Sequence, residues 1–419
     1  MAHSTSRIAG FYQLSPQERL AKVAEIAGLD DAGVAHLGNM GNVDPEVADS
    51  MIENVIGTLN IPLGVATNLI IDGEEQLVPM ATEESSVVAA VCNAARQCRD
   101  SGGFVTDATS PMMIAQVQLV EVPNPEFARI KLLEARGRIK QICDATDPVL
   151  LKHGGGFRDL EARVVEDMLI VHLLVDVRDA MGANAVNSMA EAVAPSLAEW
   201  SGGKSRLRIL SNLADRRLVR ARATWHLDQI GGEEVRDGIL SAYRFADLDP
   251  YRAATHNKGI MNGVSAVVLA TGNDTRAVEA GAHAFAARTG RYRSLSHWET
   301  DGDGNLTGTL EMPMPVGLIG GATRSHPTAR YCLEILGVTQ AERLARIIVA
   351  VGLAQNFAAM KALTTTGIQK GHMALHAKNI ALMAGAQGDE VALVADILVK
   401  KGTVRVDVAE SELAALRQS

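Results

Sequence analysis

Apolar side chains recur at helical spacing in several stretches of the chain. Between residues 83 and 99, Val87, Val91 and Ala95 fall on one stripe, which predicts an amphipathic helix. The pair Gly102-Gly103 then predicts a break. The same reasoning predicts helices over residues 16–27, 45–56, 127–142, 183–200, 274–288 and 341–363.

The middle of the chain alternates apolar and polar positions instead. Val117 and Leu119 are interleaved with Gln118, which is typical of a strand with one buried face. Strands are predicted on such grounds over residues 114–122, 169–177, 207–210 and 223–227. Because helices alternate with these strands, residues 112–216 are expected to form a small α+β insert. Gly367 and Gly371 bracket a predicted hinge, so the last segment is expected to be a separate unit.

Composition narrows the class of protein. A chain of 419 residues exceeds the size at which one hydrophobic core keeps growing, so two or three domains are expected. The apolar share of 47% is ordinary for a globular protein and argues against disorder. A net charge of −9 gives no general attraction to nucleic acid. The four cysteines form no CxxC pair, which indicates reduced thiols in a cytoplasm.

Neither a leader nor a membrane span is expected. Residues 1–10 lack the charged region followed by an apolar stretch that marks a signal peptide. Apolar windows such as Ile347–Ala354 are far shorter than the ~20 residues needed to cross a bilayer. The sequence therefore favours a cytoplasmic protein with no membrane partner.

Glu84 is the first candidate for chemistry. Projected onto a helix from residue 83, Glu84 falls on the apolar stripe, whereas Glu83 is rotated away from it. Burying a carboxyl raises its pKa and makes it a candidate proton donor, although a helix N-terminus favours the anion. Acidic residues also commonly decorate a first helical turn, so the residues alone leave both interpretations open.

Lys258 and Asp274 are the next candidates. Lys258 lies in a Gly/Asn-rich segment, expected to be a loop, immediately before a buried apolar run over residues 263–270. A partly buried ammonium can stabilise a developing oxyanion, but a plain surface lysine fits the segment equally well. Asp274 follows Thr271-Gly272-Asn273 at a helix start, where it can be a simple N-cap. Next to Lys258 and Glu84, it would couple the titration of all three groups.

Two glycine-containing segments complete the set. His372 follows the predicted hinge and suits a general acid on a mobile flap, although a solvated loop histidine fits the segment too. His376 would add a second metal-compatible ligand, but without HExxH or a third ligand no metal is expected. Residues 179–184 join a strand to a helix, where backbone N–H groups can receive a pyrophosphate. They lack GxGxxG, so a Rossmann fingerprint is absent, and a plain turn is the alternative.

Together the segments resemble those of class II 3-hydroxy-3-methylglutaryl-coenzyme A (HMG-CoA) reductases, soluble enzymes that interconvert this thioester and mevalonate. The likeness covers nearly the whole chain, and the motifs follow the family's order. The matching motifs are ENVIG at 53–57, PMATEE at 79–84, DAMGAN at 179–184, NKGIMNG at 257–263, TGND at 271–274 and GHM at 371–373.

The resemblance implies an α+β architecture and a role for each matching residue. It implies a large, mainly helical substrate-binding domain (1–111 and 217–366), a small non-Rossmann dinucleotide-binding domain (112–216) and a C-terminal flap (367–419). The implied catalytic residues are Glu84, Lys258, Asp274 and His372. The implied substrate-binding residues are Glu53, Ser86, Arg252 and Asn262. The implied cofactor-binding residues are Asp147, Asp179, Met181, Gly182 and Asn184.

The implied reaction makes sense of these residue types. Reducing a thioester to an alcohol takes two hydrides from a nicotinamide cofactor. Lys258 would stabilise the oxyanion, His372 would protonate the departing coenzyme A thiolate, and Glu84 would supply a proton to the aldehyde. A carboxylate at Asp147 would accept ribose hydroxyls and repel a 2′-phosphate, so NAD(H) is favoured over NADP(H), although Lys152 and Arg158 lie nearby.

The expected partners are HMG-CoA, mevalonate and coenzyme A, and the resemblance implies a homodimer or an assembly of dimers with active sites at the interface. A thiolase-like acyl-CoA enzyme is one rival, but it needs an activated cysteine. A non-catalytic nucleotide-binding regulator is another, but it has no need of an acid, a lysine and a hinged histidine together. The direction of the reaction stays open.

Overall fold

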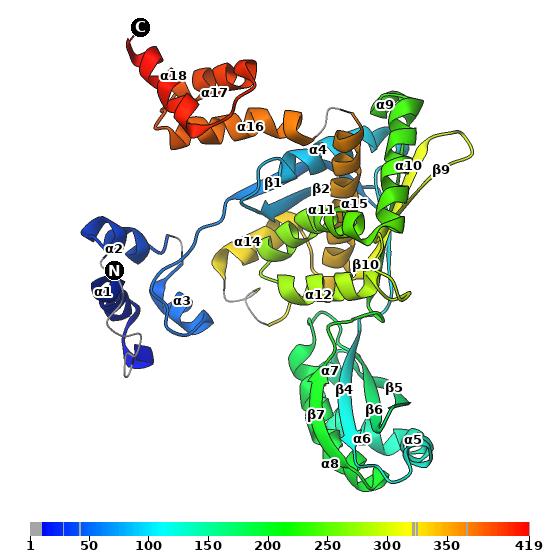
Figure 1. Ribbon diagram of the computed structural model, residues 1–419. Helices are drawn as coiled ribbons and strands as arrows, with labels where there is room; N and C mark the ends of the chain where they lie inside the picture. The colour runs from blue at the N-terminus through cyan, green and yellow to red at the C-terminus, as the bar shows by residue number, and fades with distance from the viewer. Residues whose placement is uncertain are drawn as a thin grey trace.

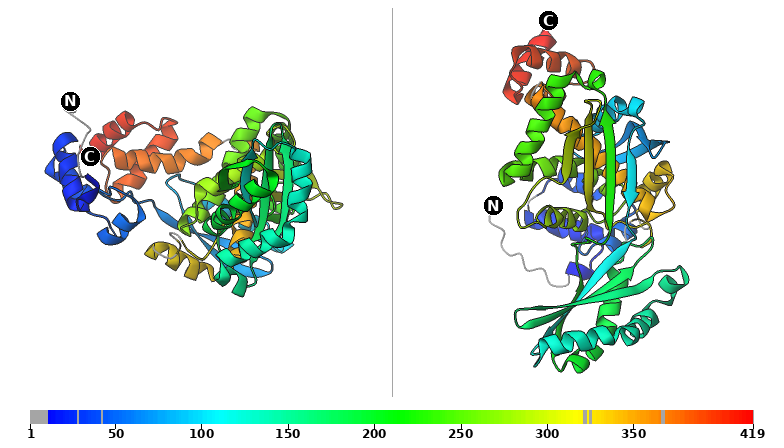
Figure 2. Two further views of the ribbon diagram at one scale, coloured as in Figure 1. Left: turned by 90° about the horizontal axis from the view of Figure 1, so that it is seen from below. Right: turned by 90° about the vertical axis from the view of Figure 1, so that its right-hand side faces the viewer.

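The computed structural model describes residues 11–27, 29–41, 43–320, 323, 326–365 and 368–418, without the side chains of residues 12, 368–375 and 418. A central body carries three projecting parts: the N-terminal helices, the C-terminal helices and a small α+β unit (Figure 1). Figure 2 shows the same parts from two further sides. Helices and strands are both abundant, which confirms the predicted α+β class.

The body is built on an antiparallel four-stranded sheet in the order β3-β8-β10-β9. In β8 the residues Val219, Ala221, Ala223 and Trp225 alternate with more exposed positions, so one face of the sheet is buried. Trp225 stacks on Phe357 of α15 with ring centroids 4.3 Å apart. The strands are β3 (Val105–Ala108), β8 (Leu218–Trp225), β9 (Ser296–Thr300) and β10 (Leu306–Pro313).

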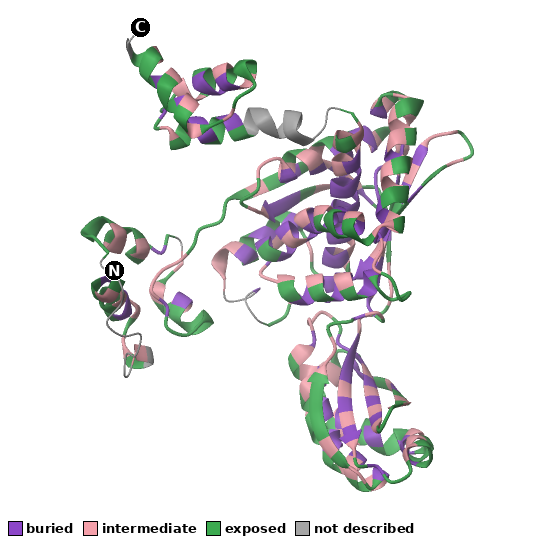
Figure 3. Ribbon diagram, viewed as in Figure 1, coloured by how far each residue is buried: buried purple, intermediate pink, exposed green. Residues whose placement is uncertain are grey.

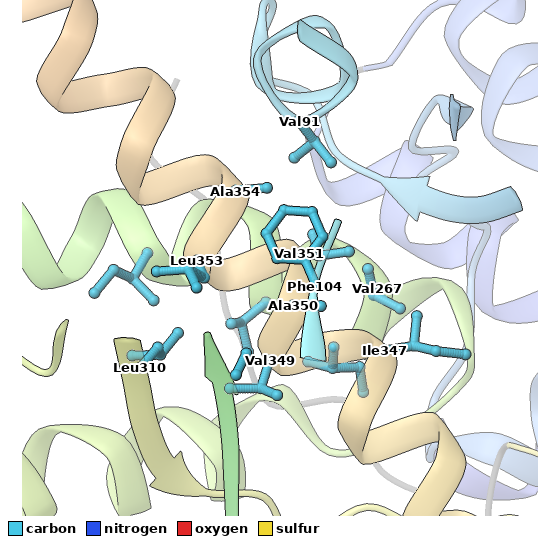
Figure 4. Packing of buried hydrophobic residues seen from close by; sticks show 14 of the residues in the cluster. Val91, Phe104, Val267, Leu310, Ile347, Val349, Ala350, Val351, Leu353 and Ala354 are labelled. Carbon is cyan, nitrogen blue, oxygen red and sulfur yellow. The ribbon is translucent and has the colours of Figure 1, made fainter. Parts of the chain in front are cut away.

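The helix α15 (Ala341–Thr364) runs through the centre of this body. It is long and apolar enough to cross a membrane by length and composition, but 67% of its most apolar window is buried inside the protein. Packing against the sheet and against α4 and α11 explains its composition (Figure 4). The other body helices are α4 (Val87–Gln97), α9 (Leu227–Ile230), α10 (Glu233–Leu248), α11 (Pro250–Ala270), α12 (Thr275–Ala286) and α14 (Pro327–Leu336).

A hairpin of β1 (Leu63–Ile71) and β2 (Glu74–Ala81) packs on α4 at the edge of the body. Its outward side is apolar and exposed, with Leu63, Val65 and Leu77 each at least 40% exposed (Figure 3). The helices α1 (Pro16–Ala27), α2 (Asp31–Gly38) and α3 (Pro45–Met51) precede it, on an extended connection (Figure 1). The C-terminal helices α16 (Ile368–Met383), α17 (Glu390–Lys401) and α18 (Val406–Gln418) enclose a small apolar cluster of their own.

The small unit has a second antiparallel sheet, in the order β5-β6-β4-β7, and its own apolar core. Helix α8 packs on β4 and β7 and contacts α5 and α6. The elements are β4 (Met112–Val120), α5 (Pro125–Glu134), α6 (Arg136–Thr146), α7 (Pro148–Lys152), β5 (Gly156–Val165), β6 (Met168–Asp176), α8 (Ala183–Ser201) and β7 (Lys204–Leu210).

Several predicted boundaries are wrong for local reasons. The helix predicted over 45–56 ends at Met51, because the backbone of Ile52 is extended (φ −143°) and Asn54 adopts a left-handed conformation (φ 59°). The helix predicted over 127–142 is two helices that meet at Ala135. The hairpin β1–β2 and the strands β3, β5, β9 and β10 are not among the predicted strands, although Leu306, Leu310 and Met312 of β10 do alternate with polar residues.

A buried histidine makes stability depend on pH. His256 of α11 is 3% exposed, and its Nε2 lies 2.9 Å from the hydroxyl oxygens of both Ser294 and Ser296. Burial, reinforced by Arg252, lowers the pKa of His256 to about 3. In the unfolded chain the group titrates near its usual ~6.5, so acid protonates the unfolded state first.

The free energy of unfolding should therefore fall as the pH drops from about 6.5 towards 3, by at most ~1.4 kcal/mol per pH unit from this group. Above pH 6.5 its contribution is fully present. Urea unfolding at pH 7 and pH 5 measures the difference, and His256→Gln should make it smaller. An equal pH dependence in that variant would show that other groups cause the effect.

Candidate active site

Two segments far apart in the sequence meet at a lysine–glutamate pair. Nζ of Lys258, on α11, donates to Oε2 of Glu84 at 2.9 Å. Nδ2 of Asn262, one turn further along α11, lies 3.4 Å from the same oxygen. Glu84 sits in the connection between β2 and α4, and its backbone N–H donates to Oγ1 of Thr82 at 3.2 Å. An ammonium, an amide and a carboxylate thus face one small region.

The pair is open to solvent in the single chain. The Lys258 side chain is 60% exposed and that of Glu84 is 40% exposed. An ion pair this exposed contributes little to stability, ~0–1 kcal/mol. The pair therefore contributes little to the folding of the chain.

The predicted helical environment of Glu84 is wrong. The helix α4 begins at Val87, and Ser86 before it has a left-handed backbone (φ 74°), which excludes a continuous helix from residue 83. Glu84 is exposed in the described chain, so it does not lie on a buried apolar stripe. The turn, instead of a helix face, directs this carboxylate towards Lys258.

The predicted loop around Lys258 is also wrong, because residues 250–270 form the single helix α11. Asp249 caps it by accepting from the Arg252 N–H at 2.9 Å. Tertiary contacts override the low helix propensity of its asparagines and glycines. The Asn257 side chain bonds Arg293 and Leu295, and a Cβ on Gly263 would lie 2.9 Å from the Gln355 Cβ. Glycine is needed there for α11 to pack closely on α15.

Two of the predicted substrate-binding residues have polar groups without a protein partner. Oγ of Ser86 is buried and makes no hydrogen bond within the described part of the chain. The half-buried guanidinium of Arg252 has no carboxylate partner among the described residues, and burial lowers its pKa. Arg252 is therefore free to pair with an anionic ligand, while Ser86 Oγ is unsatisfied but not exposed to solvent in the described chain. Glu53, in contrast, lies exposed in the turn that follows α3.

Asp274 does not join Lys258 within one chain. It is the N-cap of α12, and its Oδ1 accepts from the backbone N–H groups of Arg276 and Ala277 and from the Arg276 side chain. Partial burial opposes its ionisation, but these hydrogen bonds outweigh that effect and lower the pKa of Asp274. Lys258 lies 12 residues before Ala270, the last residue of α11, so a rise of ~1.5 Å per residue places its Cα roughly 18 Å from the helix end that leads to Asp274.

The other predicted acid, His372, can be placed only by its backbone. It lies in α16, and its side chain is outside the described residues. The predicted hinge is wrong at Gly371, because α16 begins at Ile368 and runs through that glycine. Gly367 lies outside the described residues.

The predicted cofactor turn joins β6 to α8. Gly182 has φ 102°, and a Cβ there would lie 2.6 Å from Cγ1 of Val177, so only glycine fits. The N-cap of α8 is Gly182, which has no side chain, so within the described part of the chain the first N–H groups of α8 lack a side-chain cap. Met181 is partly buried in the turn and Asn184 is exposed in the first turn of α8. Asp147, in the same unit, caps α7 by accepting from the Leu150 N–H at 2.9 Å.

A pair of arginines lies near this turn, of which the sequence points only to Arg158, as a neighbour of Asp147, and not to Arg178. Arg158 and Arg178 both contact Oδ2 of Asp176, at 3.3 and 3.0 Å, and both donate to the carbonyl oxygen of Gly154. The two guanidiniums are 40% and 44% exposed and outnumber the single buried carboxylate. They leave a net positive charge beside the turn, which suits an anionic ligand. The position of Arg178 next to Asp179 was the available signal.

The cysteines do not fit a nucleophile. Burial raises the pKa of both Cys98 and Cys143 to about 12 and raises that of Cys332 as well. The Cys92 sulfur accepts from the Thr67 N–H at 3.2 Å and has no histidine partner in the described residues. A thiolate at neutral pH is disfavoured at the three buried positions, which argues against a thiolase-like mechanism.

Comparison with known proteins decides the family. The profile of hydroxymethylglutaryl-coenzyme A reductase matches residues 15–377. The chain belongs to the HMG-CoA reductase family. It is 57% identical over 417 residues to 3-hydroxy-3-methylglutaryl-coenzyme A reductase of Archaeoglobus fulgidus, covering 99% of this chain and 95% of that protein. It is 36% identical over 348 residues to a probable HMG-CoA reductase of Borreliella burgdorferi, covering 81% and 79%.

A solved structure of this family also has the same fold as this chain. The class II HMG-CoA reductase from Streptococcus pneumoniae, bound to NADPH in open conformations, superposes with a TM-score of 0.77 at 42% identity. The match covers 96% of this chain and 99% of that one. This HMG-CoA reductase therefore has the class II fold, and its reaction is the reduction of HMG-CoA to mevalonate with a nicotinamide dinucleotide.

Proposed function

We propose that this reductase uses NAD(H) in preference to NADP(H), and that Glu84 and Lys258 of one copy work with Asp274 of a second copy. The observation that carries the proposal is the 2.9 Å contact between Lys258 Nζ and Glu84 Oε2 on an exposed surface. Residues 112–216 are proposed as the dinucleotide-binding domain and residues 367–419 as the flap that carries His372. A cytoplasmic location is part of the same proposal.

Lys258 and Glu84 suit the two carbonyl reductions. The ammonium lies where it can stabilise negative charge that develops on the thioester or aldehyde oxygen. The Glu84 carboxyl group, held by Lys258 and Asn262, is placed to donate a proton to that oxygen as the alcohol forms, once it has taken that proton from solvent. Arg252, half-buried and without a carboxylate partner in the described chain, is proposed to bind the substrate's own carboxylate through paired hydrogen bonds.

The cofactor supplies hydride, and the turn at 179–184 is proposed to hold its pyrophosphate. The uncapped N-terminus of α8 offers N–H groups and a positive dipole end, and Arg158 and Arg178 add positive charge nearby. Asp179 is proposed to act through the shape of the turn, because its carboxylate accepts from the Ala341 N–H at 2.7 Å. His372 is proposed to protonate the leaving thiolate.

Asp147 is the proposed determinant of cofactor preference. Asp147→Ser should keep the cap of α7, because serine is also a good N-cap, while removing the negative charge. The ratio of kcat/KM for NADPH to that for NADH should rise by ~10-fold, since like-charge repulsion of a 2′-phosphate is lost. Steady-state assays with each cofactor measure the ratio, and an unchanged ratio would assign the preference to another residue.

A second copy of the chain is proposed because the single chain is incomplete in two ways. Asp274 lies beyond the C-terminal end of α11, and that end is roughly 18 Å from Lys258 at a rise of ~1.5 Å per residue. The β1–β2 hairpin and the connection before it expose Leu59 (90%), Leu63 (45%) and Leu77 (52%). Exposed apolar surface of this kind marks an interaction site. A closed dimer would cover it and bring two different patches of each copy into contact.

The direct test is an assay of mevalonate plus coenzyme A with NAD or NADP separately, followed by the absorbance of the reduced nicotinamide. Turnover with NAD at a higher kcat/KM than with NADP supports the proposal. A preference for NADP overturns the cofactor assignment, and absence of turnover with both overturns the proposed activity.

A further inference from the structure

A short segment of the body, residues 314–319, contacts the backbone of the proposed cofactor turn; we call this segment the strap. The Leu318 N–H donates to the Asp179 carbonyl at 2.8 Å, and Ala180 forms a β-bridge with Ile319. A Cβ on Gly317 would lie 2.3 Å from the Met181 nitrogen and 2.8 Å from the Ala180 carbonyl carbon. The strap and the turn are therefore in backbone contact that leaves no room for a side chain.

Arg217 joins the strap to the turn through hydrogen bonds. Its side chain is 5% exposed, and Nη1 donates to the carbonyl oxygens of Ala180 and Met181 at 3.1 and 3.2 Å. Nη2 donates to the carbonyl oxygen of Val316 at 2.6 Å. Burial lowers the pKa of Arg217 to about 10, which still leaves the group charged at neutral pH. Burying a guanidinium is costly; the charges of Asp179 and Asp176 offset part of that cost, and the three carbonyl contacts satisfy its N–H groups.

The strap also reaches the loop that carries Asp274. The Gly317 N–H donates to Oδ1 of Asn273 at 2.8 Å, and Asn273 is the residue immediately before Asp274. On the opposite side, the Met314 N–H donates to the Arg217 carbonyl at 3.0 Å. One backbone segment therefore supports both the proposed cofactor turn and the loop of a proposed catalytic residue.

We infer that the strap, with Arg217 and Asn273, is a positioning element that fixes the cofactor turn relative to the Asp274 loop. The inference rests on the proposed function, because it takes residues 179–184 as the dinucleotide site. Arg217 is a positioning residue: its guanidinium faces carbonyl oxygens of the protein and acts on the cofactor only through the turn. Its removal should change cofactor binding more than substrate binding.

Gly317→Ala is the most direct test, since its new methyl group pushes on the Met181 nitrogen. The KM for the reduced nicotinamide should rise by ~10-fold or more, because displacements of about 1 Å are costly to binding geometry. The KM for HMG-CoA should stay within about twofold, since Lys258 and Arg252 are supported by α11. Gly302→Ala is the matched control, because a Cβ at Gly302 meets nothing within 4 Å. Arg217→Lys, which keeps the charge but loses the paired contacts, should show a smaller rise in the same constant.

Two outcomes overturn the inference. Equal changes in both KM values together with a lower Tm would show a merely structural role. An unchanged cofactor KM in Gly317→Ala would show that the strap does not position the turn. Ala183→Glu, which places a carboxylate at the start of α8, separates the causes. If it raises the cofactor KM while Gly317→Ala does not, the proposed site stands without the strap. If neither variant changes it, the proposed site at the turn is wrong as well.

Discussion

Lys258→Ala should lower kcat for HMG-CoA reduction by ~10³-fold while the protein stays folded, because a preorganised charge beside a developing oxyanion is worth several kcal/mol. The Lys258 side chain is 60% exposed and pairs with the exposed Glu84, so the variant leaves no cavity and no buried unpaired charge among the described residues. Steady-state kinetics and a thermal unfolding curve measure the two parts of the prediction.

Lys204→Ala is the matched control for this variant. Lys204 is 64% exposed and pairs with a glutamate, Glu121, on the small unit. Its loss should leave both kcat and Tm close to those of the wild type. Near-normal turnover in Lys258→Ala would remove Lys258 from the mechanism, and unfolding of that variant alone would mean that the exposed pair has a structural role.

Mixed dimers of Lys258→Ala and Asp274→Ala chains should regain activity that neither variant has alone. If each active site takes Lys258 from one copy and Asp274 from the other, a mixed dimer contains one intact site and one doubly defective site. Random reassortment makes half of the dimers mixed, so about a quarter of the wild-type activity should return. The experiment compares activity before and after joint refolding of equal amounts of the two chains.

The control is a mixture of Lys258→Ala with Glu84→Ala, whose residues lie 2.9 Å apart in one chain. This mixture should stay inactive, because every site in a mixed dimer then lacks one member of the pair. Activity in neither mixture would place Asp274 in the same copy as Lys258, and normal activity of Asp274→Ala alone would place Asp274 outside the mechanism. A size measurement on each mixture confirms that the chains have assembled.

Sequence patterns predicted the regular, strongly periodic elements well. The apolar stripes of α8 and α15 and the alternation in β4 and β6 lie close to their predicted bounds. Their periodicity reflects burial of one face, which propensity and pattern both report. The C-terminal segment is helical as a unit with its own core, while the proposed domain limits at 112, 217 and 367 stay predictions.

The site itself was less predictable, because long-range contacts decide its local structure. Asn257 and Gly263 argue for a loop by propensity, yet bonds to Arg293 and Leu295 and close packing on α15 stabilise a helix. Ser86 adopts a left-handed backbone conformation that no local sequence pattern predicts. This conformation ends the turn that contains Glu84. The family resemblance predicts Glu84 and Lys258 as site residues, but the sequence does not predict the turn before α4 and the helix α11 that bring them together.

The helix α11 has a consequence for how this enzyme can vary. Arg252, Lys258 and Asn262 lie along this helix of 21 residues, and Asp274 follows its last turn. The middle of α11 would therefore contribute to the active site of its own chain. Its C-terminal end would contribute to the active site of the neighbouring chain. A tilt of α11 would therefore move Arg252, Lys258 and Asp274 in both active sites together. Substitutions where α11 packs on α15, such as those at Gly263, should therefore change the activity of both active sites of a dimer and never of one alone.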